Sequence, residues 1–154
     1  NWINEATGLP VFNVKDGEAD PSSYDFLVIG SPILYYKVLS HKWIRSNWPN
    51  INKKPIIFFT VSGAVAGEKL DGWIANSDLP EDFISKINHV ALRGRQIPDE
   101  LSFYDRVMLR IAAMKNPDPQ ASKEEREGFD YMDKSSIKPI VKLVKQLQSN
   151  EVLT

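Results

Sequence analysis

The sequence predicts an open α/β fold in which a mainly parallel sheet is covered by helices on both faces. Residues 25–30 (DFLVIG) and 56–61 (IIFFTV) are apolar without alternation, a pattern typical of strands that are buried on both faces. Each stretch is followed by a loop and then by a segment with helical periodicity. This alternation of strands and helices indicates βαβ units, in which neighbouring strands run parallel.

The composition is that of one globular domain spanning residues 1–154, with 42% hydrophobic and 25% charged residues. The formal net charge of -1 provides no overall field for nucleic acid or an anionic membrane, so neither is an expected general partner. Because the chain has no cysteine, disulfides, thiolate catalysis and cysteine-based metal sites are excluded. No apolar run reaches the roughly 18 residues of a membrane span. We expect a cytoplasmic protein, at most peripheral to the inner face of the membrane.

The N-terminal stretch carries three short signals. Residues 1–8 (NWINEATG) read as the end of a helix that Gly8 closes. Residues 10–15 (PVFNVK) are rich in β-branched and aromatic side chains and predict a strand. Residues 16–23 predict a loop that leads to the apolar strand at 25–30.

Two prolines are expected to end elements in the next part of the chain. The strand at 25–30 should stop before Pro32, because proline cannot continue an interior strand. The following segment, 39–48, predicts a helix that Pro49 stops. The inward contacts expected of this region are Val38, Trp43 and Ile44.

The second half of the chain repeats the arrangement. The strand at 56–61 leads into a small-residue loop, Ser62-Gly63-Ala64. The elements expected after it are a helix at 67–76, a strand at 89–93, a helix at 103–115, a charged loop at 116–129 and a helix at 135–148. In the last helix the spacing of Ile137, Ile140, Val141, Val144 and Leu147 predicts one apolar face.

The loops after the two apolar strands are expected to form a crevice. Ligands of open parallel sheets bind beyond the carboxyl ends of the strands, where both loops begin. Tyr35 and Tyr36 offer flat aromatic faces, and Ser31, Ser62 and the main chain of Gly63 offer hydrogen-bonding groups without bulk. This mixture suits a planar heterocycle with polar edges.

These two strands and loops resemble those of flavodoxin-like proteins. YDFLVIGSPILYY (24–36) is similar to their third strand and aromatic loop, and KKPIIFFTVSGAV (53–65) to the next strand and its loop. The resemblance implies an FMN cofactor whose isoalloxazine ring lies between the loops. The cofactor-binding residues that it implies are Ser31, Pro32, Ile33, Leu34, Tyr35, Tyr36, Val61, Ser62, Gly63 and Ala64.

The resemblance also implies a strand that the sequence does not contain. Flavodoxin-like sheets have the strand order 2-1-3-4-5, and their first strand leads into a loop that holds the FMN phosphate at a helix N-terminus. If residues 1–8 are the end of the first helix, that strand and the phosphate loop lie ahead of Asn1. We expect a short apolar strand there, followed by a turn rich in Ser, Thr and Gly.

A narrower resemblance concerns the segment after the fifth strand. HVALRGRQIP (89–98) and the following FYDRVMLRIAAMK (103–115) are similar to menaquinone-dependent, oxygen-independent protoporphyrinogen oxidases, in which a Tyr-Asp-Arg sequence occurs at this place, as Tyr104-Asp105-Arg106 does here. This implies an FMN-dependent oxidoreductase that takes electrons from protoporphyrinogen and passes them to a quinone. The alternatives are a flavodoxin-type electron carrier with a redox partner protein, and a flavodoxin-shaped binding module without a cofactor. No catalytic residue is assigned, because the flavin supplies the electron chemistry.

Each candidate residue also has a purely structural interpretation. The two tyrosines stack on flavin or cap a core, and Ser62-Gly63 contacts the ring or makes a tight turn. The helix at 103–115 packs on the sheet or lies on a membrane near the quinone.

The candidate arginines also have two interpretations. Arg93, Arg95 and Arg106 bind substrate carboxylates or are simply solvated. His41 and His89 have no neighbouring set of ligands in the sequence, so no metal site is expected. The sequence gives no indication of the oligomeric state.

Overall fold

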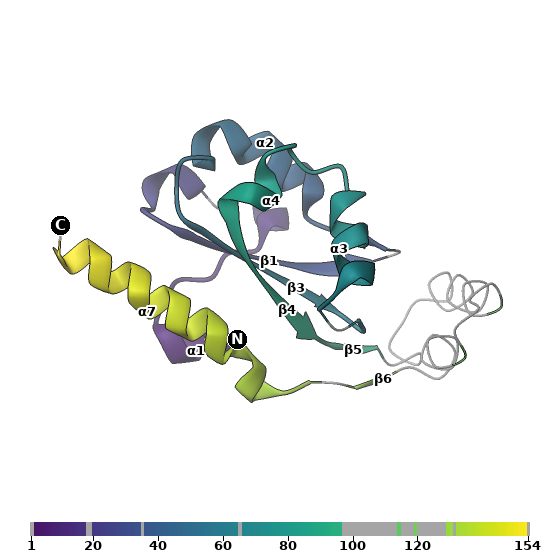
Figure 1. Cartoon of the computed structure of the whole chain (residues 1–154). Coiled ribbons are helices and arrows are strands. Elements are labelled where there is room, and N and C mark those ends of the chain that lie inside the picture. The colour runs from purple at the N-terminus through teal and green to yellow at the C-terminus, as the bar shows by residue number, and fades with distance from the viewer. Residues whose placement is uncertain are drawn as a thin grey trace.

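A computed structural model of the chain describes residues 2–17, 20–34, 36–64, 66–96, 114, 119, 129–130 and 132–153. In this part of the chain, helices lie on both faces of an open sheet (Figure 1). The predicted α/β fold class is therefore confirmed. Within these residues, no helix combines the length and the apolarity needed to cross a bilayer.

The main sheet has four strands in the order β2-β1-β3-β4. Its members are β1 (Leu27–Leu34), β2 (Lys37–Val38), β3 (Ile56–Ser62) and β4 (Ile87–Arg93). β1, β3 and β4 run parallel, in the order predicted for strands three, four and five. β2 is a short antiparallel addition to the end of β1. A separate antiparallel pair consists of β5 (Arg95–Gln96) and β6 (Phe129–Asp130).

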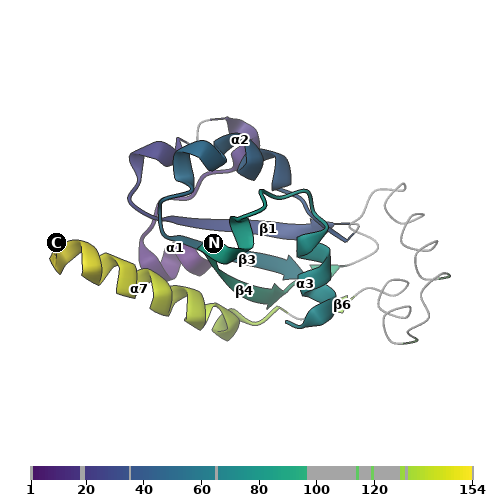
Figure 2. The ribbon, with the colours of Figure 1, turned by 45° about the horizontal axis from the view of Figure 1, so that its top comes forward.

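Two helical layers cover the sheet, as both views in Figures 1 and 2 show. One layer contains α2 (His41–Ile51), α3 (Glu68–Ala75) and α4 (Phe83–Lys86). The other contains α1 (Trp2–Thr7) and α7 (Lys138–Leu153). Short 3-10 helices η1 (Val14–Asp16), η2 (Pro21–Ser23) and η4 (Lys134–Ile137) precede β1 and α7.

Each layer has its own hydrophobic core. The first core, under α2, α3 and α4, is centred on buried Phe58 and Phe83, whose rings meet edge to face at 5.1 Å. The second core, under α1 and α7, contains buried Ile57 of β3 together with Ile140 and Val144 of α7. Successive residues of β3 thus point into opposite cores, as expected of a strand with two covered faces.

Most predicted elements are confirmed with small shifts of their ends. The helix that Gly8 closes is α1, and Gly8 has the left-handed φ of 74° that favours glycine at a helix end. The strands at 56–61 and 89–93 and the helix at 67–76 correspond to β3, β4 and α3. The helix predicted at 135–148 is α7, which the 3-10 helix η4 precedes. The helix at 103–115 and most of the loop at 116–129 lie outside the described residues.

The strand predicted at residues 10–15 is wrong. Residues 9–13 have no regular structure and continue into η1. The sequence has strand-forming residues there, but a strand needs a neighbour to accept and donate its main-chain hydrogen bonds. Among the described residues, no strand lies beside this segment.

Both prolines were wrongly expected to end their elements. β1 continues through Pro32 to Leu34, and α2 continues through Pro49 to Ile51. Among the described residues, no strand pairs with Pro32 on the side of β1 away from β3, so its missing N–H costs no ladder bond there. Pro49 lies in the last turn of α2, where its missing N–H removes a single helical hydrogen bond. The helix still ends with a hydrogen bond from the N–H of Asn52 to the carbonyl of Trp48.

Candidate functional site

The two predicted loops lie at the same edge of the sheet. β1 and β3 are parallel, and Pro32 is the register partner of Val61. The chain therefore leaves both strands at one edge, which is the edge where open parallel sheets bind ligands. We call residues 31–36 the first turn and residues 61–64 the second turn.

The first turn is shorter than the sequence predicted. Ser31, Pro32, Ile33 and Leu34 belong to β1, and Ile33 and Leu34 pair with β2. The chain has reversed direction by Lys37, which pairs with Leu34, and Tyr36 adopts a left-handed φ of 64°. Positive φ values are those that tight hairpin loops between antiparallel strands require. Tyr35 lies outside the described residues.

Ser31 has a structural role in this arrangement. It is 1% exposed, and its hydroxyl accepts a hydrogen bond of 3.1 Å from the N–H of Ser40, just ahead of α2. The same hydroxyl lies 3.0 Å from the carbonyl oxygen of Pro32, to which it donates. The Ser31 side chain thus fastens α2 to β1 and does not offer its hydroxyl to the crevice.

Tyr36 is half-exposed and rests on an aromatic side chain of α3. Its ring centroid lies 5.1 Å from that of Trp73, with the rings inclined by 46°. The amino group of Lys69 lies 5.3 Å from the centroid of the Trp73 ring, within the range of a cation–π interaction. Since 46% of Tyr36 remains exposed, the ring is supported by Trp73 and still has surface for a ligand.

The second turn is held from inside and from β4. Within the turn, the N–H of Ala64 donates to the hydroxyl of Ser62 at 3.2 Å. From β4, Arg93 donates to the carbonyl of Gly63 twice, from Nε at 3.0 Å and from Nη2 at 2.7 Å. The N–H of Gly94 donates to the carbonyl of Ser62 at 2.9 Å. The hydroxyl and carbonyl groups of this turn are thus largely committed to its own shape.

Sequence reasoning missed two of these residues. Trp73 was assigned only to a helix, although its position after the second turn could have marked it as a neighbour of the carboxyl edge. Arg93 was considered only as a partner of substrate carboxylates or as a solvated side chain. The register partner of Arg93 is Ser62, so the pairing of β3 and β4 sets the guanidinium beside the second turn.

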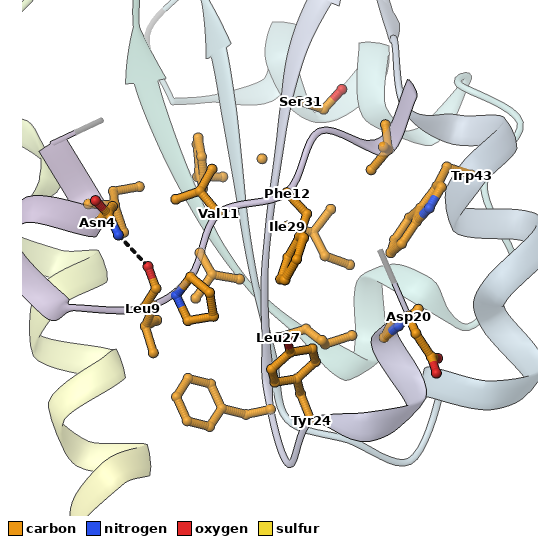
Figure 3. A pocket seen from close by; sticks show the side chains of 18 of the residues that line it. Asn4, Leu9, Val11, Phe12, Asp20, Tyr24, Leu27, Ile29, Ser31 and Trp43 are labelled. Atoms are coloured by element: carbon orange, nitrogen blue, oxygen red, sulfur yellow. Dashed lines mark hydrogen bonds between the residues drawn. The ribbon is translucent and has the colours of Figure 1, made fainter. Parts of the chain in front are cut away.

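A groove with a volume of about 780 Å³ runs along the edge of β1 that faces away from β3 (Figure 3). Its floor is β1, and the segment 9–14 and η2 form its sides. At the end of α1, the Asn4 side chain donates to the carbonyl of Leu9 at 2.6 Å, which holds the entry to that segment. Of the predicted site residues that the structure describes, those lining the groove are Ser31, Pro32 and Val61.

His89 packs against residues of the first core. Among the described residues, no group of three His, Asp or Glu side chains is arranged to hold a metal ion. His89 of β4 lies with its Nε2 3.0 Å from the hydroxyl of Thr60, and its ring is 5.8 Å from that of Phe58. Burial lowers the pKa of His89, and the nearby Asp71 carboxylate opposes part of this shift. The first core therefore disfavours the charged form of this imidazole.

The residues present suit the ring of a flavin better than its phosphate. Tyr36, which is 46% exposed, and the main chain of the second turn lie at the same edge of the sheet. Ring binding by aromatic stacking and main-chain contacts needs no charged side chain.

Residues 1–123 match a protein family model described as "Flavodoxin domain". A search of curated proteins and a search of solved structures each returned no match. The matched range includes β1, β3 and β4 and both turns.

Proposed function

Because the chain belongs to the flavodoxin domain family, we propose that it is a redox protein that binds FMN with the flavin ring between the first and second turns. The observation that carries this proposal is the common edge of the two turns, set by the parallel register of β1 and β3. When bound, FMN supplies the transfer of electrons. The protein supplies the position and the surroundings of the ring.

Each turn has a separate task in this proposal. Tyr36 packs against one face of the ring, and Trp73 behind it keeps the tyrosine from turning away. The second turn meets the edge of the ring with its main chain. Arg93 is a positioning residue, because its two hydrogen bonds to the Gly63 carbonyl fix the direction of the neighbouring peptide groups.

Titration with FMN tests the proposal. We expect flavin fluorescence to be quenched on binding, and Tyr36→Ala to raise the dissociation constant about tenfold, since an aromatic contact contributes roughly 0.5–1.5 kcal/mol beyond its area. Tyr24→Ala is the matched control: Tyr24 is also an exposed tyrosine, with 37% exposure, but it lies ahead of β1, at the opposite edge of the sheet.

Two negative outcomes of this titration lead to different conclusions. If a folded protein leaves FMN fluorescence unchanged, the redox proposal is wrong and a binding module without a cofactor is favoured. If FMN binds but Tyr36→Ala and Tyr24→Ala have equal effects, the ring lies elsewhere.

The finer proposal is an oxidoreductase of the protoporphyrinogen type that delivers electrons to a quinone. It rests on the resemblance of residues 89–98 and 103–115, and Tyr104-Asp105-Arg106 lies outside the described residues. The alternative is an electron carrier with a redox partner protein. Mixing the oxidised, FMN-loaded protein with protoporphyrinogen, and separately with a reduced ferredoxin, distinguishes them. Bleaching of the flavin absorbance by protoporphyrinogen supports the enzyme, and bleaching by the ferredoxin alone supports the carrier.

A further inference from the structure

Ser77 connects α3 to β2 through a single hydroxyl. The residue is fully buried and lies just beyond the end of α3. Its Oγ donates to the carbonyl of Trp73 at 2.5 Å and accepts the N–H of Val38 at 2.9 Å. Its own N–H donates to the carbonyl of Ile74 at 3.1 Å, so Ser77 is itself held by the last turn of α3. One side chain therefore joins the end of a helix to the main chain of a strand.

The hairpin of β1 and β2 leaves the N–H of Val38 to this hydroxyl. The N–H of Leu39 donates to the carbonyl of Pro32 at 3.0 Å. In an antiparallel pair, successive residues of one strand direct their main-chain groups to opposite sides, so the N–H of Val38 is turned away from β1. Val38 is fully buried, and a buried N–H needs a partner within the protein. A shift of β2 away from α3 would therefore cost the bond to Ser77.

α3 in turn is fixed to the sheet. Its side chains Leu70 and Ile74 are buried in the first core. At its start, the N–H of Asp71 donates to the carbonyl of Gly67 at 2.9 Å. Gly67 closely follows the second turn in the sequence. α3 thus begins just after the second turn and ends at the hydroxyl that holds β2, and it connects the two turns of the candidate site.

α3 and the hairpin meet a second time through aromatic rings. Tyr36, which directly precedes β2, rests on Trp73 with the ring centroids 5.1 Å apart. Trp73 therefore contacts the hairpin with its ring and, through Ser77, with its carbonyl. The attraction between packed atoms falls steeply with distance, and a gap of about 0.5–1 Å removes roughly a quarter to a half of it. A small displacement of β2 would weaken the support that Tyr36 receives.

We propose that Ser77 is a positioning residue of the candidate ligand site, which holds the rings of Tyr36 and Trp73 in contact. The proposal rests on the proposed function, because that function supplies the planar ligand. Ser77 is fully buried, so it acts through β2 and not by touching the ligand. It serves the part of the ligand that stacks on Tyr36, which is the flavin ring and not the phosphate.

A purely structural role of Ser77 leads to a different expectation. If the hydroxyl only satisfies the buried N–H of Val38, its removal lowers stability but leaves the surface of Tyr36 in place. Another substitution that costs similar stability would then affect ligand binding to the same extent. Val144→Ala provides this comparison, because Val144 is fully buried in the second core, on the other face of the sheet.

Proton NMR tests the positioning without flavin. Nuclear Overhauser cross-peaks between the rings of Tyr36 and Trp73 report their separation, because the intensity falls steeply with distance. In Ser77→Ala we expect these cross-peaks to lose about half of their intensity or more, since the rings are no longer held together from behind. In Val144→Ala we expect them to be unchanged.

Flavin titrations test the consequence for binding. Ser77→Ala should raise the dissociation constants of FMN and of riboflavin, which has no phosphate, by the same factor of about three to five. In the Tyr36→Ala background, Ser77→Ala should change either constant by less than about twofold, because the ring that it positions is gone. Val144→Ala should leave both constants unchanged. If Ser77→Ala does not fold, Ser77→Cys gives the same comparison, because its sulfur is a weak acceptor of similar size.

Several results would overturn the proposal. The cross-peaks could keep their intensity in Ser77→Ala, or the substitution could weaken binding equally with tyrosine and with alanine at position 36. Weakening of the same size in Val144→Ala would also contradict it. A protein that binds neither flavin contradicts the proposed function, and the ring cross-peaks then still decide whether Ser77 positions Tyr36.

Discussion

Gly30→Ala tests how closely the side chains of β3 approach the main chain of β1. A Cβ at Gly30 would lie 2.0 Å from Cζ of Phe59 and 2.6 Å from Cε1 and Cε2. These separations are far inside van der Waals contact, so the ring or the strand must move. Adding a methyl group to a packed site costs about 1–3 kcal/mol. Alanine also lowers the conformational entropy of the unfolded chain, which stabilises the folded state by about 0.4–1 kcal/mol. We expect a net loss of about 1–2 kcal/mol.

Urea unfolding followed by tryptophan fluorescence measures this loss. With a slope of about 2 kcal/mol per molar urea, the midpoint should fall by about 0.5–1 M. Gly72→Ala is the matched control, because an added Cβ at this α3 position meets nothing within 4 Å. That variant should gain stability, since alanine is preferred to glycine inside a helix by roughly 1 kcal/mol.

The clash can be assigned to Phe59 by a double mutant. Phe59→Leu removes the atoms that the added methyl group would meet, so Gly30→Ala should cost less in that background. An unchanged midpoint for Gly30→Ala, or an equal cost with phenylalanine and leucine at position 59, would refute the reasoning.

Three further outcomes are expected. Ser77→Ala should cost about 1–3 kcal/mol in urea unfolding, because the fully buried Ser77 hydroxyl accepts the N–H of Val38 at 2.9 Å and alanine leaves that donor unpaired. Arg93→Gln should weaken FMN binding about fivefold by loosening the second turn, whereas Arg45→Gln, at an exposed arginine of α2, should not. The pKa of His89 is lower in the folded protein than in the unfolded chain, so stability should fall as the pH drops below the ordinary histidine pKa of about 6.5. His89→Gln should flatten that dependence in thermal unfolding measured at several pH values.

The parallel core of the sheet could be predicted because its signal is local. Strands between two helical layers favour apolar runs, and residues 27–29 of β1 and 56–59 of β3 provide them, although Gly30, Pro32 and Leu34 of β1 are exposed. The errors at Pro32 and Pro49 have a different origin. Whether a missing N–H matters depends on what lies opposite it, and a single sequence does not show that. The same limit explains the failed strand at 10–15, whose residues favour a strand but beside which no described strand lies.

The sequence predicted that the two turns lie at one edge of the sheet, and the register of β1 and β3 confirms this, but it did not predict the contacts that the turns make. The rule that ligands of open parallel sheets bind at the carboxyl edge made both turns candidates from the strand ends alone. The support of Tyr36 by Trp73 and the bonds from Arg93 to Gly63 join residues that are distant in the sequence. Such pairs follow from the strand register and from helix placement, which propensity and periodicity do not specify.

Pro32 limits how far any neighbour can follow β1. It has no main-chain N–H, and its carbonyl accepts the N–H of Leu39 at 3.0 Å. A strand that paired with β1 on the side away from β3 would therefore find no free main-chain donor at Pro32. From the next residue, Ile33, this edge of β1 is paired with β2. Strand pairing along this edge of β1 is therefore interrupted within the first turn, at the residue where the candidate ligand edge begins.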